Sequence, residues 1–388
     1  MSAKNLLIIL FIGIAVVLAA GCTQPATGPH KASETPVVNM TVPFGPIPVA
    51  STDGVNIAYE LELKTMGNTT LVPEKVEVLD PATGNVLYTE DRTLLASLYH
   101  PADVPPPAQA ELQGGTGKIP MPRISIWFKV SPNAVPDKLV HRLTLNRTGD
   151  GLTPVTITGG EVTVRKDLAP VAVGSPVKGP GWLVMETTSP MVHHFRSQIT
   201  MNGVTRVPQR YAQDYIYLDP VTGEAVSGNE TVARNYYGFG KEITAVAGGT
   251  VVDSRDGTPD IEITTQKMPA SVDTAAGNYV IIDIGNKKYA CYAHMVNGSV
   301  RVKKGDTVTE GQVIGLMGNS GNSDAPHLHF QVVTDTPLFL GAEGYPIIYR
   351  SFNVTGRFNE TSMEETFFRE PVHQENLLME NDVIVSFP

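Results

Sequence analysis

Short runs of alternating apolar and polar residues dominate the chain between residues 42 and 166. The stretch Val55-Asn-Ile-Ala-Tyr-Glu-Leu-Glu-Leu63 alternates as a strand with one buried face should. Further runs of this kind cover residues 76–79, 86–88, 124–130, 139–145, 155–157 and 162–164. Strands at this spacing predict a β-sandwich, immunoglobulin-like in general architecture, over residues 42–166.

A second series of short strands follows, and its corners are marked by glycine. The runs are residues 243–252, 277–285, 288–295 and 302–318. Glycine suits sharp corners because it has no Cβ to clash. We therefore predict an antiparallel β domain over residues 182–356, joined to the first by a proline- and glycine-rich linker at 167–181. The acidic residues 357–388 are predicted to form a C-terminal tail, and the whole fold is expected to be all-β.

The N-terminus has the pattern of an export signal. Lys4 precedes the apolar run Leu6 to Ala20, which is shorter than a comfortable transmembrane helix. The run ends in Leu18-Ala-Ala-Gly-Cys22, which resembles a lipobox with Cys22 as the lipidated residue, although an uncleaved anchor is the alternative. We predict a signal or anchor at residues 1–22, a linker at 23–41, and a protein exported and held at the outer face of the cell membrane.

Composition narrows the class of protein. The 388 residues are 41% hydrophobic and 18% charged, as in a globular protein long enough for two domains. The formal charge of −10 argues against a nucleic-acid partner. Cys291 is the only cysteine besides Cys22, so no intrachain disulfide is expected in the mature protein.

The candidate chemistry centres on the tripeptide His327-Leu328-His329. Two histidines two residues apart on a strand point to the same face. Neutral imidazole is the commonest protein ligand of zinc, so such a pair can share metal binding and proton transfer. The spacing alone is weak evidence, because chance pairs of this kind are common.

The surrounding motifs strengthen the case. They are Ala245-Val-Ala-Gly-Gly-Thr-Val251, Tyr292-Ala-His294, the run from Val302 to Gly315, and His327-Leu-His-Phe330. In this order they resemble the lysostaphin/LytM-type zinc endopeptidases, over about residues 182–333. The resemblance implies the duplicated hybrid motif fold with a zinc groove, and cleavage of peptide cross-links in cell-wall polymers.

The resemblance also implies roles for individual residues. His329 corresponds to a zinc ligand, and His327 to the partner that handles the water. His294 corresponds to a second histidine that activates water or stabilises the oxyanion. Asp214 stands where the family has the aspartate of its His-x-x-x-Asp motif, but Arg210 stands where the histidine belongs. Arginine stays protonated and cannot bind zinc, so a third ligand must come from elsewhere.

His193 and His194 are the available replacements. Asn202-Gly203 favours a two-residue hairpin turn that pairs Met201 with Val204. A regular ladder would then place His193 on the face of Asp214, whereas a one-residue slip near Pro208 would present His194 instead. We predict His193 as the third ligand and His194 as the alternative.

Two functions remain open at this stage. The first is a membrane-anchored zinc metalloendopeptidase acting on a cell-envelope polymer, with the sandwich holding the catalytic domain near its substrate. The second is an inactive, LytM-like binding or regulatory module of the envelope, which the substitution at Arg210 favours.

Overall fold

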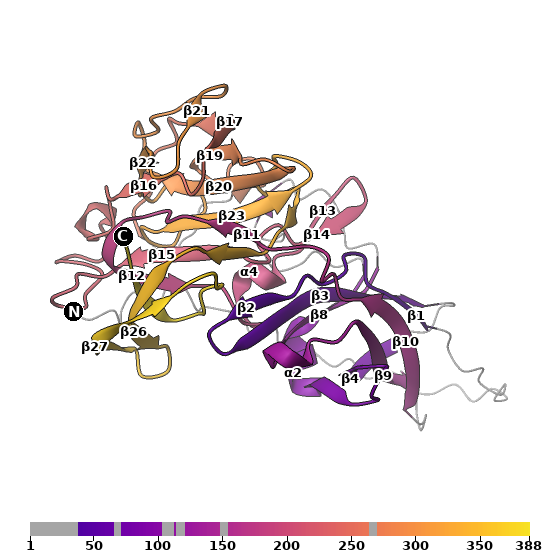
Figure 1. The fold of residues 1–388 in the computed structure, drawn as a ribbon. Helices are drawn as coiled ribbons and strands as arrows, with labels where there is room; N and C mark the ends of the chain where they lie inside the picture. Colours follow the sequence, from indigo (N-terminus) through magenta and orange to yellow (C-terminus); the bar gives the residue numbers. More distant parts are fainter. Residues whose placement is uncertain (1–37, 66–70, 103–111, 114–120, 148–153, 264–269) are drawn as a thin grey trace, which may run out of the picture.

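The computed structural model describes residues 38–65, 71–102, 112–113, 121–147, 154–263 and 270–388 (Figure 1). Almost all of its regular structure is strand, so the all-β prediction is confirmed. None of the helices in these ranges is long and apolar enough to cross a bilayer. The predicted signal or anchor at residues 1–22 lies outside the described residues.

Two sheets form the N-terminal body. One has the order β1 (Val38–Thr41), β3 (Gly54–Thr65), β8 (Arg123–Val130) and β6 (Tyr99–His100), with β2 (Val49–Ser51) paired to β3. The other has the order β10 (Val155–Thr163), β9 (Lys138–Arg147), β4 (Leu71–Leu79) and β5 (Val86–Asp91). Buried apolar side chains of both sheets share one core, as in a sandwich. The immunoglobulin-like topology stays a prediction.

The two runs predicted at residues 155–157 and 162–164 belong to one bulged strand, β10. Its register against β9 shifts between Gly159 and Val162. Gly160 has φ +65, and a Cβ there would lie 2.9 Å from the Cβ of Met40. Glycine is therefore required at the bulge by both backbone conformation and space.

One large sheet forms the second body. Its order is β21 (Thr307–Val308), β17 (Gly249–Arg255), β19 (Asn278–Asp283), β20 (Lys288–Met295), β23 (Leu328–Thr334), β15 (Gln213–Tyr217), β12 (Gly179–Met185), β28 (Val383–Phe387), β26 (Phe352–Asn359) and β27 (Glu364–Gln374), and β24 (Glu343–Gly344) pairs with β23. The centre of this sheet, where β20, β23 and β15 adjoin, carries the candidate site.

The segments predicted as linkers and tail are partly strands. Residues 38–41 of the first linker form β1, and residues 171–173 of the second form β11, which pairs in parallel with β25 (Ile347–Tyr349). The C-terminal tail supplies β27 and β28, and β28 lies between β12 and β26. The apolar run of β28 is buried, which explains why this end of the chain packs into the sheet.

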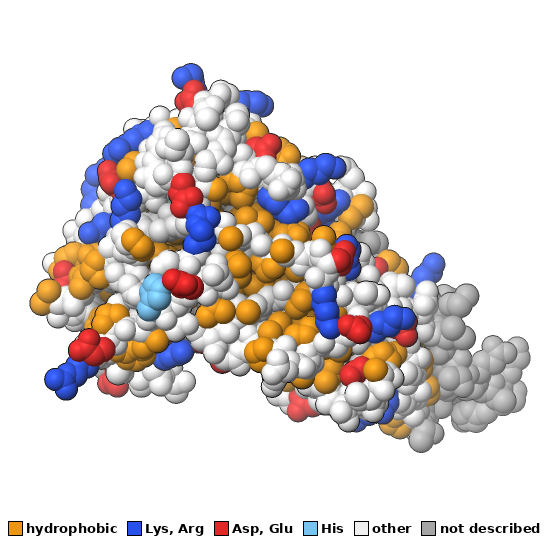
Figure 2. All heavy atoms as spheres, viewed as in Figure 1, with side chains coloured by type: hydrophobic (Ala, Val, Ile, Leu, Met, Phe, Trp, Pro, Cys, Tyr) orange, Lys and Arg blue, Asp and Glu red, His pale blue; other side chains and the backbone are white. Residues whose placement is uncertain are grey.

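The two bodies share a hydrophobic core. Along β8 the side chains alternate, so that Phe128 packs inside the sandwich and Trp127 packs into the core of the second body. Figure 1 shows the short helix α4 (His193–Arg196) between the sandwich and the large sheet. On the face shown in Figure 2, hydrophobic side chains gather over this junction, while acidic and basic ones are interspersed around it.

Glu90 on β5 introduces a pH dependence into the sandwich. Its side chain is fully buried, and burial raises its pKa to about 8, an effect that the Tyr88 hydroxyl opposes only weakly. In the unfolded chain it ionises near its ordinary value of 4.5. Between these values the folded state binds the proton and the unfolded state does not, so the free energy of unfolding falls as pH rises.

We expect Glu90→Gln to remove this slope between about pH 4.5 and pH 8. Urea denaturation of the full chain across that range measures it. Glu161→Gln is the control, because Glu161 is an exposed partner of Lys138. An unchanged slope in Glu90→Gln would show that this carboxyl group does not carry the effect.

Candidate metal centre

Asp214 and His329 face each other across two adjacent strands. They are opposite one another in the antiparallel register of β15 and β23, and both are buried. His329 Nδ1 lies 3.0 Å from Asp214 Oδ1. On β20, Ala293 is the next partner of His329, which brings His294 beside the pair. The sheet register alone thus assembles three of the predicted residues.

The third metal-binding candidate reaches Asp214 by a route that differs from the prediction. The hairpin pairs Met201 with Val204 as predicted, but its ladder ends at Ile199 and Arg206. Before that point the chain forms α4, so the predicted strand through His193 is wrong. In α4, His194 is buried with Nε2 3.4 Å from Asp214 Oδ2, whereas the His193 side chain is exposed and lies outside the cluster.

His194, Asp214 and His329 have the donor set and the orientation that zinc requires. Their ligand atoms all lie within 4.8 Å of one another. His194 Nδ1 donates to the carbonyl of Glu186 at 2.9 Å, and His329 Nε2 donates to Gln331 Oε1 at 2.8 Å. Each ring therefore has its other nitrogen free of a proton and directed at Asp214. Outer partners of this kind orient metal-binding histidines in known sites.

The orientation of Gln331 is itself determined. Its Nε2 donates to the carbonyl of Phe339 at 2.7 Å, which leaves Oε1 for His329. Asp214 Oδ1 is fully buried without a hydrogen-bond donor, as expected for an oxygen that binds a cation. A zinc ion held by these two histidines and one carboxylate would have room for a water molecule or substrate as a further ligand.

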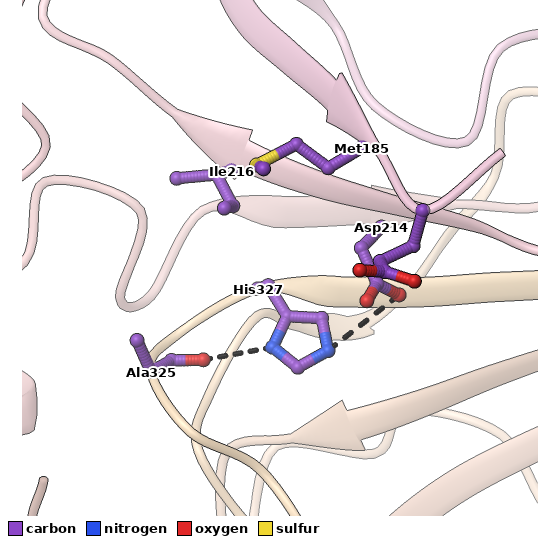
Figure 3. A pocket seen from close by; sticks show the side chains of 6 residues that line it. Met185, Asp214, Ile216, Ala325 and His327 are labelled. Carbon is purple, nitrogen blue, oxygen red and sulfur yellow. Dashed lines mark hydrogen bonds and ion pairs between the residues drawn. The ribbon is translucent and has the colours of Figure 1, made fainter. Parts of the chain in front are cut away.

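The two remaining histidines lie at the edge of this group. His327 Nε2 is 3.6 Å from Asp214 Oδ1, and His327 Nδ1 contacts the carbonyl of Ala325 at 2.7 Å (Figure 3). His294 Nδ1 contacts the carbonyl of Ser320 at 2.8 Å, and the two rings are 4.7 Å apart. A carbonyl can only accept, so Nδ1 of each ring carries a proton and, in the neutral form of the ring, Nε2 has none. Both can accept a proton from water.

The backbone of His294 is in a conformation that side chains rarely adopt. Its φ is +62, in the left-handed region. Two backbone hydrogen bonds hold it there, from His294 N to the carbonyl of Ala276 and from Gly318 N to the carbonyl of His294, each 3.0 Å long. Strain of this kind persists where the surroundings determine the geometry, and it is common at functional sites.

Burial controls the charges in the cluster. It lowers the pKa of His194 to about 3 and that of His294 well below its ordinary value, so both rings are neutral at physiological pH. Burial alone would raise the pKa of Asp214, but His194, His327 and His329 together bring it well below its usual range. An ionised Asp214 carboxylate is the form that binds a metal ion.

Arg210 does not approach the cluster. Its guanidinium is buried between two carboxylates, with Nη1 and Nη2 each 2.6 Å from the oxygens of Glu60 and with Nη2 2.5 Å from Glu343. Glu60 lies on β3 of the sandwich and Glu343 on β24 of the large sheet. The side chain that replaces the expected ligand thus connects the two bodies.

Two residues near the cluster were not predicted from sequence. Gln331 follows His329 by two positions on the same strand face, so the alternation of β23 could have indicated it. Glu186 lines a small pocket beside Asp214 and His327. Met185, Ile216 and Ala325 line the same pocket (Figure 3). Burial, and then the charge of Asp214, raise the pKa of Glu186 to about 7. No pattern in the sequence singles out Glu186.

Comparison with known proteins gives a family match for part of the chain. Residues 236–338 match the family model described as Peptidase family M23. This segment contains His294, His327 and His329, but neither His194 nor Asp214.

Several curated proteins are similar over limited stretches. The peptidoglycan DD-endopeptidases ShyA and ShyB of Vibrio cholerae are 37% identical over 94 residues and 31% identical over 143 residues, which are 24% and 34% of this chain. The chain spans only 20% and 29% of the lengths of those relatives. Glycyl-glycine endopeptidase ALE-1 of Staphylococcus capitis is 33% identical over 125 residues, 29% of this chain and 34% of that protein.

Among solved structures, the catalytic domain of lysostaphin from Staphylococcus simulans is 24% identical. The match covers 38% of this chain and 80% of that one, with a TM-score of 0.22.

Replacing His194 separates the two candidate ligands. We expect His194→Ala to weaken Zn²⁺ binding by more than the roughly 10–100-fold that loss of an outer partner causes. His193→Ala is the matched control and should bind Zn²⁺ as the wild type does. Chelator competition on the full chain measures both affinities. If His193→Ala had the larger effect, the geometry of α4 described above would be wrong.

Proposed function

We propose that this protein is a zinc metalloendopeptidase that hydrolyses peptide bonds in a cell-envelope polymer. The match of residues 236–338 to the family model described as Peptidase family M23 supports this proposal. The observation that carries the proposal is the convergence of His194, Asp214 and His329, with each imidazole held in the tautomer that leaves a lone pair for a metal. The peptidoglycan endopeptidases among the relatives support the polymer as the substrate class.

A zinc ion held by these three residues would polarise the scissile carbonyl and lower the pKa of water to about 7. The proton transfers would be carried out by His327 and His294, which lie beside these three residues. The Nε2 of His327 is close enough to the ligand Asp214 to receive a proton from a water molecule in the site. As the water oxygen bonds to the carbonyl carbon and the C–N bond breaks, this proton passes to the leaving amine.

His294 complements His327 in this scheme. Its Nδ1 donates a hydrogen bond to the carbonyl of Ser320, and the centroid of its ring lies 4.7 Å from that of His327. We assign it the second proton-transfer position, from which it accepts a hydrogen bond from water or, once protonated, donates one to the oxyanion. The rigid backbone at His294 keeps this ring in place, so no reorganisation is needed during the reaction.

The predicted location is part of the same proposal. The apolar run Leu6 to Ala20 and Cys22 support export and lipid anchoring at the outer face of the cell membrane, where an envelope polymer is accessible. The sandwich then holds the peptidase body away from the membrane surface. Its immunoglobulin-like architecture and the domain limits predicted above belong to this proposal too.

The alternative is a module that binds the envelope polymer without cutting it. Arg210 favours it, because that position has lost a residue able to bind zinc. The placement of His194 supports the enzyme instead, since it restores a third protein ligand.

Cleavage of purified peptidoglycan by the zinc-loaded full chain tests the proposal. We expect His327→Ala and His294→Ala each to lower kcat by roughly 10²–10⁴-fold, the usual contribution of a proton-transfer group, while Zn²⁺ stays bound. His373→Ala, an exposed histidine on β27, is the control and should keep wild-type activity. A zinc-loaded wild type that binds the polymer but releases no new termini would favour the non-catalytic module.

A further inference from the structure

We propose that the sandwich is a structural part of the metal centre, and that Trp127 and Arg210 are positioning residues for the ligand His194. This inference rests on the proposed metal site. It concerns how the third ligand is held in a chain that has lost the ligand expected at Arg210.

The element that carries His194 is too short to be stable alone. Helix α4 has four residues, and isolated helices of that length do not persist in water. Its position must therefore come from packing. The residue after His194 is Phe195, whose side chain is fully buried in the core shared by the two bodies.

Trp127 of the sandwich packs against one side of Phe195. The two rings meet edge to face, with centroids 5.0 Å apart and planes at 87°. Trp127 also contacts Tyr211 at 5.6 Å, three residues before Asp214. Its own orientation is set within the sandwich, because Nε1 donates to Asn56 Oδ1 at 3.0 Å. One sandwich side chain thus touches the segments that lead to two of the three ligands.

Arg210 supplies a second wall. Its guanidinium lies 5.9 Å from the centre of the Phe195 ring and is held by Glu60 of the sandwich and Glu343 of the large sheet. A buried arginine paired on both sides is costly to displace, because moving it would leave buried charges uncompensated. Phe195 is therefore confined between an aromatic ring and a fixed cation.

The segment between the two ligands is attached to the sandwich at further points. Gln198 Nε2 donates to Ser125 Oγ at 3.2 Å, and Arg123 Nη1 donates to the carbonyl of Thr205 at 3.2 Å. Both Ser125 and Arg123 lie on β8 and are buried. Between α4 and Arg210, the chain that connects His194 to Asp214 is therefore bonded to the sandwich at these two points.

Trp127 and Phe128 offer a matched pair of variants. They are neighbours on β8 that point to opposite sides, and Phe128 stacks on Tyr88 inside the sandwich with centroids 5.4 Å apart. Truncating either to alanine removes a buried ring from the same strand. Only Trp127→Ala removes a contact to the residue beside His194. General destabilisation of the sandwich is therefore separated from displacement of the ligand.

The experiment measures Zn²⁺ affinity by chelator competition and the visible absorption of bound Co²⁺, which reports ligand geometry, on the full chain. We expect Trp127→Ala to weaken Zn²⁺ binding about 10- to 100-fold, as loss of an outer-shell partner does, and to change the Co²⁺ spectrum. Phe128→Ala should lower the denaturation midpoint while leaving affinity and spectrum unchanged. Trp127→Phe keeps a ring against Phe195 and should retain most of the Zn²⁺ affinity. This variant still tests the inference if Trp127→Ala does not fold.

Two results would overturn the inference. The first is a Trp127→Ala variant that keeps wild-type Zn²⁺ affinity and Co²⁺ spectrum, while His194→Ala has lost Zn²⁺ binding. That result would show that the metal site does not need the contact from the sandwich. The other is an equal loss of affinity in Phe128→Ala, which would attribute the effect to stability alone. Wild-type binding in His194→Ala would instead refute the proposed metal site itself.

Discussion

The pairing of β15 with β23 is the constraint on which the site depends. It places Asp214 opposite His329, and because neighbouring strands lie about 4.8 Å apart, their side chains meet without any movement of the backbone. The pairing of β23 with β20 then brings His294 to the same place. A slip of one residue in either ladder would turn these side chains to the other face of the sheet. The flanking strands and the shared core hold that register.

The parts of the site that were predictable from sequence are those that depend on short-range pattern. His327 and His329 follow from the alternation of one strand, and the aspartate from its place in a recognised motif. The hairpin turn at Asn202-Gly203 also forms as predicted. The choice between His193 and His194 was not predictable, because it depends on tertiary contacts of α4, such as those of Phe195 with Trp127 and Arg210. The alternation of apolar and polar residues predicts that strand pairing continues along the chain. It does not reveal the tertiary contacts at which the pairing stops.

The same distinction applies to the division of the chain. Local alternation identified the longer strands of the sandwich but missed the short strands β1, β2 and β6. It also treated the sandwich and the second body as separate units. The strand β8 contributes to two cores, because it is buried on both faces, with Trp127 on one side and Phe128 on the other. The C-terminal strands show it again, because β28 inserts beside β12, a strand about 200 residues earlier in the sequence. Strand pairing between segments so far apart in the sequence cannot be predicted from the residues of one segment alone.

The buried ion pairs of Arg210 with Glu60 and Glu343 restrict which substitutions position 210 can accept. Restoring histidine at position 210 would not recover an ordinary ligand motif, because Glu60 and Glu343 would then face each other in the interior without a cation. The exchange at that position is therefore coupled to both carboxylates, one in each body. If His194 binds the metal as proposed, a substitution at Arg210 would have to be matched at Glu60 in the sandwich and at Glu343 in the large sheet.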